Sequence, residues 1–397
     1  MAVIVLLLLV GAVAYRATSE AERRRLLERA LRTLRRWHAA SPLRDPRIAS
    51  FWTQLCERTR FAPVTPALVG LNILVFAFML LGNAPPSAPE TLISWGASFG
   101  PRTTNGEWWR LVTMLFVHRS ILHLVVDVVG ILTVGVVLER LVGPAAFAAV
   151  YAAAGLSSSA FDLVASPTGL SLGASGAVFG LYGLMLAFAI GSVFDTRPTV
   201  PWMLIKYLAP PAALFAVYSL ATGAITTKPE LMAFVVGCIS GLFVARRIEE
   251  RPVSTIRTAP VVVGAIVMVI VTVRPMSGMT DMRPEIHKLA TAEEAMATRY
   301  QAAVDRFTNG RLTVRELAAV IDRDIMPELQ DARAHVASLE HIPDEQKPLL
   351  TAAQQYLQLR DESWRIRSKA LHAGNVSMLT QAEVSEIAAR YALSRIE

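Results

Sequence analysis

Histidine and cysteine are scarce in this chain, and their positions restrict the chemistry it can perform. The 397 residues include seven histidines, none of which lies between residues 124 and 286. The only two cysteines, Cys56 and Cys238, lie in a basic segment and in an apolar run, so a disulfide framework is excluded. No CxxC motif or cluster of histidine and cysteine predicts a zinc site. We expect no metal and no cofactor.

Charged residues are also few, and long apolar runs take their place. They make up 18% of the chain against 53% hydrophobic residues, and the mean hydropathy is +0.42. Several runs approach or exceed the ~20 residues that cross a hydrocarbon core as a helix. The predicted fold class is therefore an all-α polytopic membrane protein. The predicted spans are residues 64–82, 111–137, 144–164, 173–190, 201–221, 231–245 and 258–274, with a possible short extra span at 2–15.

The few titratable residues inside these spans do not form a relay across the membrane. This argues against a transporter or a channel. At the start of the second span, Trp108, Trp109 and Arg110 fit an interfacial aromatic belt with a cation that reaches lipid headgroups.

Positive charge is concentrated before the first long span. Residues 16–60 hold twelve arginines against five acids, an excess of +7 that equals the net charge of the chain. By the positive-inside rule this segment is cytoplasmic, and counting spans onward places residues 276–397 on the outer face. The arginines follow the apolar residues 2–15 instead of preceding them, which favours an N-terminal anchor over a cleavable signal peptide.

Two interpretations of the basic segment stay open. Leu27, Leu31 and Leu34 share one helical face with arginines largely around it, so the segment either lies on anionic lipid or only fixes the topology. Because topology already explains the arginines, we do not predict a nucleic-acid partner. The alanine- and arginine-rich composition favours a multi-pass protein of a bacterial inner (plasma) membrane over one of an organelle.

Residues 276–397 are predicted to form a small helical domain outside the membrane, with fifteen basic and eighteen acidic residues. Its helical periodicity breaks at Asn309-Gly310, Pro343, Pro348 and Gly374. Two L-T-x-x-E patterns, which begin at Leu312 and Leu379, predict helix starts, because threonine and glutamate satisfy free amides in the first turn. Residues 305–316 also match part of a calcium loop. Phe307 stands at a ligand position, so capping is the favoured interpretation.

A serine among small residues is the most distinctive motif, Gly173-Ala174-Ser175-Gly176, at the start of an apolar run. Two glycine sets predict helix faces nearly free of side chains, one formed by Gly173, Gly176, Gly180 and Gly183 and the other by Gly237 and Gly241. Such faces mostly serve helix packing, and their serine is either an interhelical hydrogen-bonding group or a nucleophile. The motif alone leaves both roles open.

Further motifs precede this serine in a fixed order. They are Glu107-Trp108-Trp109-Arg110, then His118, His123 and Asp127, then Leu138-Glu139-Arg140-Leu141-Val142-Gly143. With the serine motif, this succession resembles the rhomboid family of intramembrane serine proteases over roughly residues 63–275. The resemblance implies a six-helix membrane core, to which this chain adds a seventh span.

The resemblance also implies roles for single residues. In the family, a serine attacks a peptide carbonyl, a histidine on the sixth core helix is its base, and a histidine and an asparagine on the second help bind the oxyanion. Carried over, Ser175 is at the nucleophile position and His123 at the oxyanion histidine, while Asp127 replaces the asparagine. The family pattern His-x-x-Gly-x-x-x-Gly, laid on Gly237 and Gly241, places Phe234 at the histidine.

Both departures predict a loss of protease chemistry. Phenylalanine cannot accept a proton, and a positioned base contributes ~10²–10⁴-fold to the rate. An ionised Asp127 would repel the oxyanion, and losing one donor costs ~10²–10³ in kcat. Asp127 would donate only if burial kept it protonated. Asp127 and Glu230 are the nearest candidates for a substitute base, with a structural carboxylate as the alternative for each.

Two functions follow from these residues. The favoured one is a pseudoprotease that binds the transmembrane helices of client proteins within the lipid bilayer, and the alternative is an active intramembrane serine endopeptidase with a non-standard base. The predicted organisation is an N-terminal membrane anchor at residues 1–15, a basic cytoplasmic amphipathic segment at 16–62, a rhomboid-like membrane core at 63–275 and a helical extramembrane domain at 276–397.

Overall fold

The chain divides into two compact units, residues 1–277 and 278–397. The computed structural model describes residues 46–82, 84–194, 227–245 and 255–394, together with residues 212, 213 and 215. The predicted anchor at 2–15, almost all of the predicted span 201–221 and most of the basic segment lie outside the described residues.

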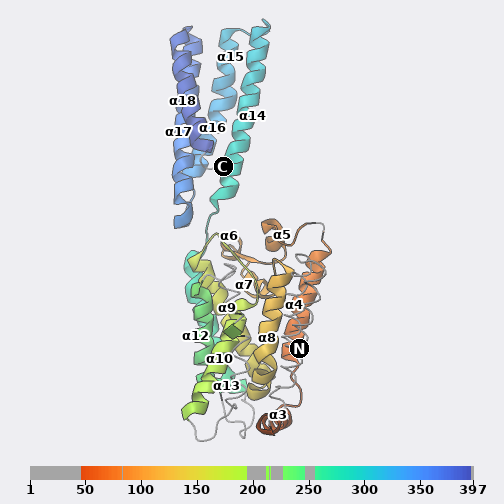
Figure 1. The fold of residues 1–397 in the computed structure, drawn as a ribbon. Coiled ribbons are helices and arrows are strands. Elements are labelled where there is room, and N and C mark those ends of the chain that lie inside the picture. Colours follow the sequence, from red (N-terminus) through yellow and green to blue (C-terminus); the bar gives the residue numbers. More distant parts are fainter. Residues whose placement is uncertain are drawn as a thin grey trace. The chain divides into compact units, whose positions relative to one another are not determined.

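Helices build the first unit (Figure 1). Its longer helices are α3 Pro46–Arg58, α4 Val64–Leu80, α8 Ile121–Val142, α9 Pro144–Ala165, α10 Ser175–Phe194, α12 Thr227–Val244 and α13 Thr255–Val273. The shorter elements are α5 Pro89–Ser94, α6 Gly100–Thr103, α7 Arg110–Thr113, the 3₁₀ turn η2 Met114–Phe116 and the 3₁₀ turn η3 Arg274–Met276. Within the described residues, Ile121–Val142, Pro144–Ala165 and Ile256–Met276 are long and apolar enough to cross a membrane, and Val64–Leu80 and Ser175–Gly191 are shorter apolar helices.

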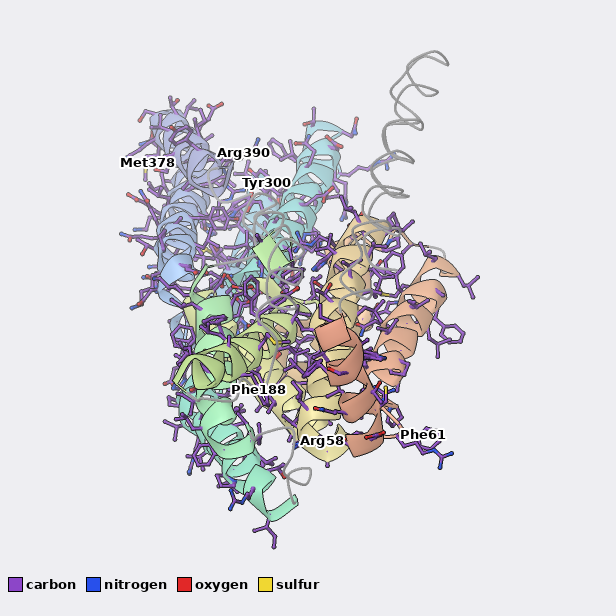
Figure 2. The ribbon with its side chains drawn as sticks, turned by 60° about the horizontal axis from the view of Figure 1, so that its bottom comes forward. Arg58, Phe61, Phe188, Tyr300, Met378 and Arg390 are labelled. Carbon is purple, nitrogen blue, oxygen red and sulfur yellow. The ribbon has the colours of Figure 1, made fainter. Side chains whose placement is uncertain are left out.

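Helix α9 takes part in most of the packing of this unit. It contacts α8, α10, α12 and α13, and α10 also contacts α8 and α12. On α10, Phe188 is 2% exposed, whereas Phe61, in the linker before α4, is 73% exposed and points away from the helices (Figure 2). Most of the buried apolar side chains of this unit lie on α8, α9 and α10, and α3, α12 and α13 add a few more.

Glu139 fixes the start of α4 against α8. Its side chain is fully buried, and its two carboxylate oxygens accept hydrogen bonds from the amides of Val64 and Thr65, each at 2.8 Å. The first amides of a helix have no partner within the helix, so a carboxylate at this position both caps the helix and favours its dipole. The neighbouring Arg140 donates to the carbonyl of Thr59 and so holds the segment that leads into α4.

The predicted span 111–137 is wrong at its start. Arg110 to Phe116 form α7 and η2, the backbone is extended at Val117, and α8 begins only at Ile121. The Ser120 side chain accepts a hydrogen bond from the amide of His123 and caps this new start. His118, Arg119 and Ser120 interrupt the apolar run here, and the Ser120 cap sets the new helix start.

A short antiparallel pair, β1 Ser98–Phe99 and β2 Leu170–Ser171, joins two loops of the first unit. Ser98 pairs with Ser171 and Phe99 with Leu170. The pair connects the loop after α5 to the loop that leads into α10. It therefore holds the approach to Ser175.

The second unit is a helical bundle with its own core (Figure 1). Its elements are α14 Met282–Thr308, α15 Val314–Val320, the π-helical turn η4 Ile321–Ile325, α16 Met326–Ala337, the 3₁₀ turn η5 Asp344–Gln346, α17 Lys347–Ala373 and α18 Val376–Ser394. Trp364, Tyr356 and Leu357 are among its most buried side chains. Arg360 lies in the same core, where its guanidinium pairs with Glu293 at 2.7 Å and stacks on Trp364.

One of the two predicted capping boxes is present. The Thr313 side chain accepts from the Glu316 amide, and the Glu316 side chain accepts from the Thr313 amide, so α15 starts as predicted. The prediction at Thr380 is wrong, because α18 already begins at Val376. There α17 ends on Gly374 in the left-handed conformation, and Asn375 accepts from the Ser377 amide and starts the next helix.

Candidate functional site

Ser175 is the first residue of α10, and the loop before it sets its position. Gly173 has φ +102°, a conformation that a side chain would make unfavourable, and its amide donates to the carbonyl of Met114 at 2.9 Å. The prediction that Gly173 belongs to the glycine face of the helix is therefore wrong, because it lies in the turn before α10. A Cβ on Gly173 would come within 2.7 Å of the His123 ring, so this glycine lets the loop approach α8.

Asp127 connects this loop to α8. Its carboxylate is 1% exposed, and Oδ2 accepts a hydrogen bond from the Ala174 amide at 2.7 Å. The same oxygen lies 3.0 Å from Nε2 of His118 and 3.6 Å from Nε2 of His123. With three neighbours on one oxygen, Asp127 holds the residue before Ser175 in place.

The rings of His118 and His123 meet edge to face, with centroids 5.0 Å apart. His118 is fully buried, and Nδ1 lies 3.2 Å from the carbonyl oxygen of Phe116, so both of its nitrogens have partners. Both ring nitrogens of His123 lack a hydrogen bond, although only 5% of this residue is exposed. The structure thus brings together His123, Asp127 and Ser175 as the sequence predicts, but with His118 as the bonded histidine.

A polar cavity of about 100 Å³ opens beside Ser175. Serine hydroxyls line it from α9 and from the loop that leads into α10, namely Ser158, Ser166 and Ser171, together with Ser175 itself. His123 lines it from α8, and Asp162 and Glu230 contribute carboxyl groups from α9 and α12. Neither Asp127 nor Phe234 is part of this lining.

The α9 side of the cavity is absent from the residues predicted from the sequence. Ser158 and Asp162 are four residues apart on α9 and so share a face of it, and Ser166 follows directly after the helix ends. This spacing was the available signal. Without knowing that α9 packs on α10, however, nothing directs that face toward Ser175.

Glycines allow α10 to lie almost backbone to backbone with α12. A Cβ on Gly237 would come within 1.9 Å of the Gly180 carbonyl oxygen, and one on Gly183 within 2.1 Å of the Phe234 carbonyl oxygen. A Cβ on Gly241 would come within 2.3 Å of the Ala187 Cβ, and one on Gly176 within 2.4 Å of the Ser158 side chain on α9. The glycines therefore set the spacing of α9, α10 and α12.

This packing places Glu230, and not Phe234, level with Ser175. Phe234 lies one turn further along α12, where its backbone meets Gly183. Glu230 is 7% exposed, lines the cavity and has a buried Oε2 atom without a hydrogen bond. Phe234, which the family resemblance places at the histidine position, is thus an apolar side chain, and the nearest carboxyl on α12, Glu230, is one turn before it.

The prediction that the Arg110 side chain reaches lipid headgroups is wrong. Arg110 is 2% exposed, donates to the carbonyls of Ala97 (3.1 Å) and Ile93, and pairs with Glu107. Trp108 and Trp109 remain 69% and 42% exposed. The arginine therefore organises the loop from inside, while the two indoles provide its outer apolar surface.

The architecture and the site together define a helical membrane protein with a serine held at the start of a buried helix. The protein-family model described as the rhomboid domain matches residues 105–250. Rhomboid protease GluP of Bacillus subtilis is 32% identical over 181 residues, which are 46% of this chain and 34% of that protein. Putative rhomboid protease YdcA of the same organism is 32% identical over 133 residues, 32% of this chain and 63% of that protein.

A relative with a different description is also similar. Inactive RHOMBOID-like protein 8 of Arabidopsis thaliana is 31% identical over 115 residues, 28% of this chain and 33% of that protein. The chain spans about one third to just under two thirds of the length of the first curated relatives it matches. No solved structure matches. These comparisons support membership of the rhomboid family over the matched region, residues 105–250.

Proposed function

We propose that this protein is a pseudoprotease of the rhomboid family that binds transmembrane helices of client proteins without cutting them. The observation that carries the proposal is the unbonded imidazole of His123. It is the histidine that lines the cavity among the described residues, and neither of its ring nitrogens is hydrogen-bonded. The Ser175 hydroxyl is thus not held by a histidine base, and a serine is a weak nucleophile without one.

Two further features support this proposal. Phe234 stands at the position where the family resemblance implies the base, and its side chain cannot take up a proton. At the oxyanion position, Asp127 uses Oδ2 to accept from the Ala174 amide, so this oxygen is not a donor to a developing negative charge. Both elements of the chemistry are therefore missing, while the scaffold around Ser175 is kept.

We place the helical unit on the outer face and the arginine-rich segment in the cytoplasm, in a bacterial inner (plasma) membrane. The support is the charge of residues 16–60, twelve arginines against five acids, which the positive-inside rule assigns to the cytoplasm. Protease accessibility of one tag inserted within residues 16–60 and one at the C-terminus, in sealed spheroplasts and in inverted vesicles, tests this orientation.

An active endopeptidase is the second candidate, and one observation favours it. Glu230 lines the cavity with Ser175 and keeps a buried carboxyl oxygen free of hydrogen bonds, so it has the chemistry of a substitute general base. The two candidates differ in products. Co-expression with a panel of tagged single-span proteins should give co-purified intact clients, with the same pattern for wild type and Ser175→Ala. Cleavage fragments that disappear in Ser175→Ala would establish the endopeptidase instead.

A further inference from the structure

The cavity beside Ser175 contains polar groups that have no partner within the protein. Glu230 is only 7% exposed, and its Oε2 atom has no hydrogen bond. His123 is 5% exposed, and neither of its ring nitrogens is bonded. Buried polar atoms in native proteins nearly always have a partner. Two such side chains on one cavity indicate that something else completes their hydrogen bonds.

Acceptors and negative charge dominate the lining. Two carboxyl groups, Asp162 and Glu230, face the cavity from different helices, and Arg119 is the one basic side chain among the lining residues besides His123. Arg119 is itself exposed, so water solvates much of its charge. The serine hydroxyls can rotate to accept from any donor. A group that carries several donors and a positive charge fits this lining better than an anion does.

The neighbouring surface of α12 fits a membrane helix. Leu231, Val235, Ile239 and Leu242 repeat every three or four residues and are 62%, 42%, 50% and 81% exposed. They form an apolar stripe that starts beside Glu230. An apolar helix that lies along this stripe would bring a side chain of its own to the cavity.

We propose that the cavity binds the basic side chain of a client transmembrane helix, with the Glu230 carboxylate as its principal partner. The inference rests on the proposed function and adds the class of client. A lysine in a membrane span is costly unless it is paired. Its ammonium group has three donors on a thin apolar stem, which suits a cavity of about 100 Å³. Helices that carry an unpaired lysine are therefore the clients that this site would select.

The test uses the full-length protein in lipid nanodiscs and three synthetic membrane-spanning peptides. The peptides share one leucine- and alanine-rich sequence and carry lysine, glutamine or norleucine at one central position. Norleucine has the shape of the lysine stem without its charge. Affinity is measured by fluorescence anisotropy of the labelled peptides. We expect wild type to bind the lysine peptide at least tenfold more tightly than the norleucine peptide.

Glu230→Gln should reduce this preference to less than threefold and leave the affinity for the norleucine peptide unchanged, which also shows that the variant is folded. Glu90→Gln, at an exposed position of α5 outside the cavity lining, is the matched control and should keep the full preference. Carbodiimide coupling gives an independent readout, because it joins a lysine amine to a carboxylate in contact with it. Mass spectrometry should find the amide bond at Glu230.

The outcomes separate this inference from the proposed function. Equal affinity of wild type for all three peptides would overturn the lysine site and leave helix binding intact. A lysine preference that persists in Glu230→Gln, with coupling elsewhere, would also overturn it. Failure of wild type to bind any of the peptides would contradict both proposals.

Discussion

The Oδ2 atom of Asp127 lies 2.7 Å from the amide nitrogen of Ala174 and accepts its hydrogen. This one contact joins α8 to the residue before Ser175, and the same oxygen also meets His118 at 3.0 Å. A carboxylate that accepts from a backbone amide in this place is a structural group. It holds the shape of the loop before Ser175.

Removing this acceptor should destabilise the first unit. Asp127→Ala leaves the Ala174 amide and the His118 ring without their buried partner, which we expect to lower the free energy of unfolding by about 1–3 kcal/mol. Asp127→Asn keeps one carbonyl acceptor and should lose less. Thermal unfolding in detergent of both variants checks the order. Equal stability of wild type and Asp127→Ala would show that the contact carries no structural role.

The contact between α10 and α12 should be sensitive to a single methyl group. Gly237→Ala places a Cβ within 1.9 Å of the Gly180 carbonyl oxygen, so the helices must move apart. Overpacking of this kind typically costs about 1–3 kcal/mol. At Gly264 on α13 an added Cβ would have no atom within 4 Å, so Gly264→Ala is the matched control. It should not lower the stability, because alanine favours a helix more than glycine does. The same unfolding midpoint for both variants would contradict this close approach.

The second unit should depend on its buried ion pair. Arg360 is 1% exposed, and Nε donates to Glu293 at 3.0 Å, an oxygen to which the Tyr356 hydroxyl also donates at 2.6 Å. Arg360→Met leaves the Glu293 charge buried and should cost about 3–5 kcal/mol. The double variant Arg360→Met, Glu293→Met removes both charges and should recover much of the loss. Additive losses, measured by native-state hydrogen exchange of the α17 amides, would exclude the coupling.

Acid should weaken the packing between η4 and α17. Although burial opposes it, hydrogen bonds from Ser368 and His372 hold the pKa of Asp322 below its ordinary value. A lowered carboxyl pKa stabilises the fold above the ordinary pKa of aspartate, and this contribution is lost as the pH falls through the lowered value. After correction for the intrinsic exchange rate at each pH, the protection of the Ile321–Ile325 amides should therefore fall below about pH 4 in wild type. Asp322→Asn should exchange faster already at neutral pH, with a weaker acid dependence. An acid response identical in both proteins would assign it to another group.

Much of the fold follows from the sequence, because apolar length and periodicity are local properties. The helices at Pro144–Ala165 and Val64–Leu80 fall within two residues of the predicted bounds. The predicted span 111–137 ran through His118, Arg119 and Ser120, although these polar residues interrupt the apolar run and the Ser120 cap decides the helix start. Arg110 was misplaced for a different reason: its partner carbonyls at Ile93 and Ala97 are 17 and 13 residues away and carry no signature of their own.

The candidate site was predictable only in part. Ser175, His123 and Asp127 came from motifs, and the structure brings them together at the junction of α8 and α10. The place of Gly173 in the turn before α10 depends on its positive φ, which the sequence does not show. That Asp162 and Ser158 line the cavity depends on the packing of α9 against α10. The level of Glu230 relative to Ser175 likewise depends on the glycine contacts between α10 and α12, which a linear pattern does not encode.

The central claim is that Ser175 has no base. The most direct measurement is labelling of the purified protein in detergent with a fluorophosphonate probe, with wild type, Ser175→Ala and the double variant Phe234→His, Asp127→Asn compared side by side. We expect no labelling of wild type above the Ser175→Ala background, because an unactivated serine attacks phosphorus slowly. Serine-dependent labelling of the double variant would show that the cleft is intact and lacks only its catalyst. Labelling of wild type that disappears in Ser175→Ala would contradict the account and identify the protein as an active serine hydrolase.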